Sequence, residues 1–181
     1  MSIFTVASRY SKSLLDLSKE QDNVDTVKDD IDQVIAILKE NSQLRKVLKN
    51  PIITTDKKHA ILAGIFEGKV NPLVLSFFSI LIDKGRANIL LEIMTEFIRN
   101  YNELKGIVNA TVVSAAPLSK ENLSELQNTI GKETNGQVIL NNSVDPSLIG
   151  GIVVRVGDKQ IDASIAGRLD KLERHFVNQG K

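Results

Sequence analysis

The sequence predicts an α+β protein: a six-helix bundle followed by a smaller mixed α/β domain that contains a β-hairpin. Three observations support this prediction. Apolar residues recur every three or four positions through the first hundred residues, which is the period of a helix that buries one face. After Gly106 the chain changes to charge-free runs rich in β-branched residues, which are typical of strands. The chain has 181 residues, 42% of them hydrophobic, so it can bury one or two cores.

The first four helices of the bundle are predicted from short apolar stripes and from the residues that end them. Asn50-Pro51 ends the third helix, since the residue before a proline disfavours the helical conformation. Thr54 or Thr55 can cap the fourth helix, and Gly68 ends it. The stripe of the first helix is wide and follows one helical face: Ile3, Val6, Tyr10, Leu14 and Leu17.

The fifth helix, residues 72–84, has more apolar circumference than one packing face requires. Asn71 is a good helix cap, and Gly85 ends the helix. Asn88 is expected to cap the sixth helix, which Gly106 closes. A helix as apolar as the fifth lies either at the centre of a bundle or against a partner, and a groove between the first and fifth helices would suit an amphipathic guest helix. The pattern leaves an ordinary bundle core equally open.

The second domain is predicted to combine a small sheet with two helices. The helices begin after Ser119 and near Ser164, and Gly157-Asp158 is a two-residue hairpin signal between the last two strands. The apolar stripe of the last helix must either cover the sheet or meet a partner, and the pattern does not decide between these. That stripe consists of Ile165, Leu169, Leu172 and Phe176. The strands are expected at 107–115, 137–144, 152–156 and 159–163.

Composition argues against several kinds of chemistry. Cysteine is absent, which excludes disulfides and thiolate catalysis. Two histidines leave few ways to build a zinc site or a histidine-based triad. Neither Gly68-Lys69 nor Gly131-Lys132 has the spacing of a phosphate-binding P-loop. We therefore expect no cofactor, no metal and no catalytic residue.

Two other function classes stay open as alternatives. An acid–base enzyme would use Asp158 and Asp162, which flank a predicted strand at even spacing, although a turn and a helix cap explain the two residues more simply. A small helical adaptor would bind nucleic acid through a basic cluster, although a net charge of +1 and an aromatic content of 4% disfavour this. The cluster consists of Arg45, Lys46, Lys49, Lys57 and Lys58.

No membrane-spanning or secretory segment is expected. The longest charge-free apolar stretch runs for 13 residues, from Val70 to Ile82, whereas a spanning helix needs roughly 20. The N-terminal residues lack the basic region and long apolar region of a signal peptide.

One long motif in the second domain resembles a known family. Residues 142–164, NSVDPSLIGGIVVRVGDKQIDAS, resemble the signature of the delta subunit of F-type ATP synthases, also called the oligomycin-sensitivity-conferring protein family, and residues 165–172 continue it. Residues 6–14, 81–86 and 112–119 are similar to the opening helix, the end of the fifth helix and the region entering the first strand. The family's commonest pattern differs at three positions, Ala87, Ala163 and Ala166.

The resemblance implies a non-catalytic stator subunit that links the catalytic head of the synthase to its peripheral stalk, so that rotor torque drives ATP synthesis coupled to proton transport. The bundle, residues 1–105, would bind the N-terminal helix of the alpha subunit, and residues 106–181 would bind the C-terminal region of the b subunit. The protein would bind no nucleic acid and would be peripheral on the cytoplasmic face of the bacterial inner membrane.

The resemblance also assigns residues to the two surfaces. The alpha-binding groove would contain Tyr10, Ser13, Leu14, Phe77, Ile80 and Leu81. For the b-binding surface the candidates are the apolar stripe of the last helix, Ile165, Leu169, Leu172 and Phe176, which would meet the b subunit if it does not cover the sheet.

Overall fold

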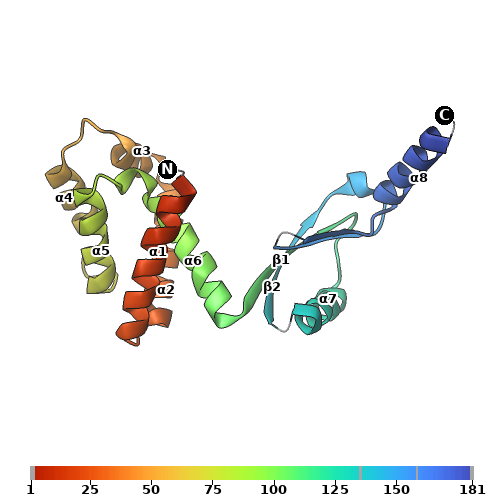
Figure 1. The fold of residues 1–181 in the computed structure, drawn as a ribbon, viewed down its shortest axis with the longest axis horizontal. Coiled ribbons are helices and arrows are strands. Elements are labelled where there is room, and N and C mark those ends of the chain that lie inside the picture. Colours follow the sequence, from red (N-terminus) through yellow and green to blue (C-terminus); the bar gives the residue numbers. More distant parts are fainter. Residues whose placement is uncertain (1–2, 135, 158, 180–181) are drawn as a thin grey trace. The chain divides into compact units, whose positions relative to one another are not determined.

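The computed structural model describes residues 3–134, 136–157 and 159–179, and the side chains of residues 176–179 lie outside the described part. The chain divides into two compact units, residues 1–102 and 103–181, and the division falls in the last turn of α6. The mixture of helices and a small sheet that the sequence predicts is confirmed (Figure 1).

Helices make up the described part of the first unit. They are α1 (Ile3–Glu20), α2 (Val24–Glu40), α3 (Ser42–Lys49), α4 (Thr55–Phe66), α5 (Pro72–Asp83), the 3-10 turn η1 (Ala87–Ile89) and α6 (Leu90–Lys105). The core between them contains the large side chains Phe66, Phe78 and Phe97, each almost fully buried.

Both ends of α5 are fixed by local hydrogen bonds. Asn71 accepts a bond from the backbone N–H of Leu73 at 2.9 Å, as a helix cap does. The N–H of Asn71 itself donates to the buried Asp30 on α2 at 2.7 Å. At the other end, Gly85 has φ +67° and its N–H donates to Ile82, which is the left-handed ending that favours glycine. The apolar face of α5 is therefore held at a defined rotation against α2.

The start of α6 differs from the prediction. Asn88 was expected to cap this helix, but it lies in the middle of η1, which leads directly into Leu90. The N–H of Ile89 donates to the carbonyl of Arg86 at 3.1 Å. A tighter 3-10 turn thus satisfies the first backbone groups without a side-chain cap.

The second unit contains a mixed four-stranded sheet in the order β2-β1-β3-β4, in which β1 and β2 are parallel and the other pairs are antiparallel. Its elements are β1 (Ile107–Ser114), α7 (Lys120–Thr134), β2 (Gln137–Val144), the 3-10 turn η2 (Pro146–Leu148), β3 (Ile152–Val156), β4 (Lys159–Asp162) and α8 (Ile165–Gln179). Helix α7 is the crossover between the two parallel strands.

One face of this sheet carries the core of the second unit. Ala110 and Val112 of β1, Val138 of β2 and Val154 of β3 pack with Ile130 of α7. On the opposite face of β1, Asn109 and Thr111 are exposed and Val113 is partly buried. Since α7 supplies the helix side of this core, α8 is not needed to complete it.

Candidate partner-binding surfaces

An aromatic contact brings α1 and α5 together. The rings of Tyr10 and Phe77 lie 6.4 Å apart between centroids, with an interplanar angle of 70°. This edge-to-face arrangement is favourable for aromatic pairs. Phe77 is buried, whereas Tyr10 is only partly buried. The contact therefore lies at the margin of the core, where the two helices meet the surface.

The residues assigned to the alpha-binding groove differ in their exposure. Leu14 and Leu81 are 0% exposed and belong to the core. Ile80 is 48% exposed, and Ser13 is exposed with its hydroxyl donating to the carbonyl of Arg9. Of the six residues, Leu14, Phe77 and Leu81 are buried, and Tyr10, Ser13 and Ile80 are at least partly accessible.

On the flank of α1 that carries Tyr10, two further apolar side chains are accessible, and the site prediction omitted them. Ile3 and Leu17 are exposed and lie on the same flank of α1 as Tyr10, at spacings of seven residues. Both belong to the stripe that the sequence shows. Their exposure was the missing information, because a stripe alone does not say which of its members the core covers.

Hydrogen bonds join α6 to α1 and to α2. Asn100 of α6 donates to the hydroxyl of Ser11 on α1 at 2.8 Å, and both residues are buried. Tyr101 of α6 donates to Asp25 of α2 at 2.7 Å. Near the start of α1, the guanidinium of Arg99 lies 5.3 Å from the ring centroid of Phe4, within cation–π range.

The apolar stripe of α8 is open to solvent in the described part of the second unit. Ile165, Leu169 and Leu172 are each about half exposed. The side chain of Phe176, the fourth member of the predicted stripe, lies outside the described residues. The N–H of Ile165 donates to the carbonyl of Gly150 at 2.9 Å, which ties the start of α8 to the loop after η2. Because these side chains are not packed into the sheet core, they are available to a partner.

Asp162 and Ser164 form the start of α8. Ser164 donates to Asp162 through its hydroxyl at 2.6 Å and through its N–H at 2.9 Å. The Ser164 hydroxyl also accepts a bond from the N–H of Gly167 at 3.0 Å, so Ser164 is the helix cap. The hydroxyl bond from Ser164, followed by its N–H bond, lowers the pKa of Asp162 below the usual value for aspartic acid.

Three of the groups behind the two alternative functions, Asp162, Lys58 and Lys49, have structural partners. Asp162 acts in the cap just described, and Asp158 lies outside the described residues. In the basic cluster, Lys58 donates to the carbonyl of Leu48 at 3.1 Å, and the ammonium of Lys49 lies 3.9 Å from a carboxylate oxygen of Glu92.

Among the described residues, no group of three or more acidic or histidine side chains is placed to hold a metal ion. Within the same residues, no helix is both long enough and apolar enough to cross a membrane.

The fold and these surfaces define a two-unit protein in which a helical unit and a small mixed sheet each carry accessible apolar helix faces. Residues 6–176 match the model of the ATP synthase delta (OSCP) subunit family. The chain belongs to this family, whose members are structural, non-catalytic subunits of ATP synthase.

Individual relatives match over almost the whole chain. The chain is 37% identical to an ATP synthase subunit delta of Cytophaga hutchinsonii over 96% of its own length and 95% of the relative. It is 33% identical to an ATP synthase subunit delta of Alkaliphilus oremlandii, covering 94% of the chain and 95% of the relative. Among solved structures, a chain of the Toxoplasma gondii mitochondrial ATP synthase hexamer has the same fold, with a TM-score of 0.75, 20% identity and coverage of 94% of this chain and 97% of that one.

Proposed function

We propose that this protein is the stator joint of a bacterial ATP synthase. The α1–α6 unit acts as a six-helix bundle that binds the N-terminal helix of the alpha subunit. The second unit binds the C-terminal region of the b subunit through α8. Family membership and the curated relatives named ATP synthase subunit delta support the assignment to this complex.

The exposure of Ile80 beside the Tyr10–Phe77 contact is the observation that supports the alpha-binding surface. An isoleucine that is 48% exposed, on a helix whose other large apolar side chains are mostly buried, marks the side of α5 that the bundle leaves uncovered. Burial of one such side chain contributes roughly 1.5–3 kcal/mol. A guest helix that buries Ile80, Leu17 and the edge of Tyr10 therefore gains enough for specific binding.

Replacement of Ile80 tests the first surface. Ile80→Asp places a carboxylate where the guest helix would bury an apolar group, so we expect affinity for a peptide of the alpha-subunit N-terminus to fall at least about tenfold. Ile52→Asp is the matched control, because Ile52 is 86% exposed and lies between α3 and α4. Titration calorimetry measures both affinities. Equal affinity of Ile80→Asp and the unmodified chain would remove Ile80 from the interface.

Changes in α8 test the second surface. Deletion of residues 164–181 should abolish binding to the b subunit and leave binding of the alpha peptide intact. A milder variant, Leu169→Ser, should weaken b binding, whereas Lys171→Ser on the same helix should not. Binding of b that survives the deletion would show that α8 is not the contact.

The two surfaces in one chain explain how a static joint could work. A chain bound to the head by one unit and to the stalk by the other would resist rotation of the head, so rotor torque would be used for ATP synthesis and proton transport. This role places the protein at the cytoplasmic face of the bacterial inner membrane, held there through the complex. On membranes from cells that lack b, we expect the protein to be lost from the membrane fraction.

A further inference from the structure

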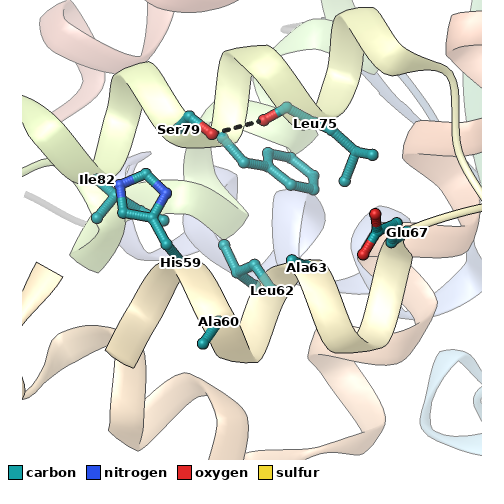
Figure 2. A pocket seen from close by; sticks show the side chains of 9 residues that line it. His59, Ala60, Leu62, Ala63, Glu67, Leu75, Ser79 and Ile82 are labelled. Carbon is teal, nitrogen blue, oxygen red and sulfur yellow. Dashed lines mark hydrogen bonds between the residues drawn. The ribbon is translucent and has the colours of Figure 1, made fainter. Parts of the chain in front are cut away.

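A second groove lies between α4 and α5, on the flank of α5 opposite to Ile80. Figure 2 shows its lining, with His59, Ala60 and Ala63 on α4, Glu67 directly after the last residue of α4, and Leu75, Ser79 and Ile82 on α5. The groove has a volume of about 300 Å³. On α5, Leu75, Ser79 and Ile82 are spaced by four and three residues and so share one flank, whereas Phe77 and Ile80 share the flank toward α1. The two flanks are separated by Ser76 and Asp83, which are exposed.

The floor of this groove is apolar and its α4 wall is low. Leu62, Phe78 and Ile82 are buried and form the base, and the ring of Phe78 meets that of Phe66 at a centroid distance of 5.6 Å. Ala60 and Ala63 line the groove on α4 with short side chains, which leave room for the side chains of a guest helix to approach the floor. The Ser79 hydroxyl donates to the carbonyl of Leu75 at 3.2 Å and is turned back to its own helix (Figure 2).

The charges at the two ends of the groove select the occupant. Glu67 is exposed at one end, and no described cation lies within ion-pair distance of it. At the other end, Nε2 of His59 lies 3.0 Å from Oδ1 of Asp83, whose side chain is largely exposed. One end of the apolar floor therefore presents the carboxylate of Glu67, and the other presents His59, paired with the carboxylate of Asp83 at the edge of the groove. Figure 2 shows His59 and Glu67 at opposite ends.

The distance between these ends sets the spacing of the partner's charges. His59 lies on α4 and Glu67 directly follows Phe66, its last residue; the seven positions from His59 to Phe66 correspond to about 10 Å along a helix at 1.5 Å per residue. A guest helix running along the groove covers that length in about seven or eight residues, and residues seven positions apart lie on the same face. Apolar residues three and four positions after the first cation then point to the floor.

We propose that the α4–α5 groove binds an amphipathic helix of another protein, in which two lysine or arginine residues seven positions apart bracket two apolar anchors. The cations meet the carboxylates of Glu67 and Asp83, and the anchors contact Leu62, Phe78 and Ile82. This groove is on the other flank of α5 from the surface proposed for the alpha subunit, so the two inferences can fail separately.

The test uses the full chain and a synthetic probe. The probe is an alanine-based helical peptide of about 16 residues, with two lysines seven positions apart and two leucines at the third and fourth positions after the first lysine. A control peptide carries glutamate at both lysine positions. Amide NMR spectra of the chain, titrated with each peptide, give the affinity and the residues that respond. We expect the lysine peptide to shift the signals of Ala60, Ala63 and Ser79, and the glutamate peptide to shift none of them.

Two variants decide the outcome. Glu67→Lys, an exposed change that should not disturb folding, reverses the charge at one end, so affinity for the lysine peptide should fall roughly tenfold while the glutamate peptide gains affinity. Ile80→Asp should leave lysine-peptide binding unchanged. The proposal is wrong if the lysine peptide shifts no groove signal at millimolar concentration, if Glu67→Lys leaves its affinity unchanged, or if Ile80→Asp weakens it as much as Glu67→Lys does.

Discussion

At the scale of single residues, Asp162 couples the end of β4 to the start of α8. Its carboxylate accepts two bonds from Ser164, and the hydroxyl bond is the larger cause of its lowered pKa. A folded-state pKa below the unfolded value gives a stabilising contribution that is present above about pH 4 and is lost as the pH falls through the folded pKa. The bonds at the start of α8 are therefore expected to weaken in acid.

Replacement of Ser164 tests this assignment. In Ser164→Ala the hydroxyl bond is gone, so the pKa of Asp162 should rise toward its ordinary value, as measured by carboxyl-carbon NMR over an acid titration. Asp145 is the internal control, because bonds from Ser147 lower its pKa in the same way. It should titrate unchanged in the variant. An unchanged Asp162 in Ser164→Ala would mean that another group stabilises its carboxylate.

The buried bond between Asn100 and Ser11 joins α6 to α1. Removing the amide in Asn100→Ala leaves a cavity and takes away a hydrogen bond to the Ser11 hydroxyl, so the free energy of unfolding should fall by about 1–3 kcal/mol. A double-mutant cycle with Ser11→Ala should show a coupling of about 0.5–1.5 kcal/mol in urea unfolding. Additive effects would show that the bond contributes little.

The sequence could not predict which residues of the candidate surface are exposed and which are buried. Leu14, Leu81 and Ile80 are all large, apolar and at helical spacing, but the first two are in the core and the third is half exposed. On a helix that is apolar around most of its circumference, periodicity does not identify the outward face. That face depends on how α5 is rotated against its neighbours, and the bond from Asn71 to Asp30, 41 residues away along the chain, helps to set it.

At the scale of elements, the left-handed ending of α5 gives a prediction about glycine. Gly85→Ala should lower the free energy of unfolding by roughly 1–2 kcal/mol, because a Cβ is unfavourable at φ +67°. No neighbouring atom lies within 4 Å of a Cβ built there, so conformational strain is the expected cause.

Gly64 is the matched control for Gly85. It lies inside α4, and a Cβ there also meets no atom within 4 Å. Gly64→Ala should therefore stabilise the protein by about 0.5–1 kcal/mol, through the helix propensity of alanine. Urea unfolding of the two variants should give changes of opposite sign. Equal losses would indicate unseen packing at both positions.

Local signals predicted most elements well because the responsible interactions are local. The strand at Gln137–Val144 has the predicted bounds, and the helix that starts after Ser119 has a bond from the N–H of Asn122 to the Ser119 hydroxyl at 3.2 Å. The 3-10 turns η1 and η2 were not predicted, since an Asn-containing or Asp-Pro segment suits a cap, a loop or a tight turn equally. The hydrophobic pattern also could not predict the order of the strands in the sheet, because strand order depends on contacts between residues far apart in sequence.

At the scale of the whole molecule, the proposed joint depends on two surfaces in separate units. Each proposed contact uses exposed apolar side chains on a helix, Ile80 in the first unit and Leu169 and Leu172 in the second. A static joint requires slow dissociation, and changes at an interface act mainly on the dissociation rate. Joining two moderate contacts in one chain raises the effective concentration of each partner near the other.

Cutting the chain between the units is the corresponding test. Expressed separately, residues 1–105 should fold, bind the alpha peptide with the affinity of the full chain and lose that binding in Ile80→Asp. Residues 106–181 should bind b, because the core formed by β1, β2, β3 and α7 lies within that fragment. Circular dichroism and calorimetry measure folding and affinity, and an equimolar mixture of the fragments provides the control for linkage.

The mixture should occupy both partners but should not restore coupled ATP synthesis to membranes that lack this protein, whereas the intact chain should. If the mixture restored coupling as well as the intact chain, the covalent connection between the units would not be what holds the head to the stalk.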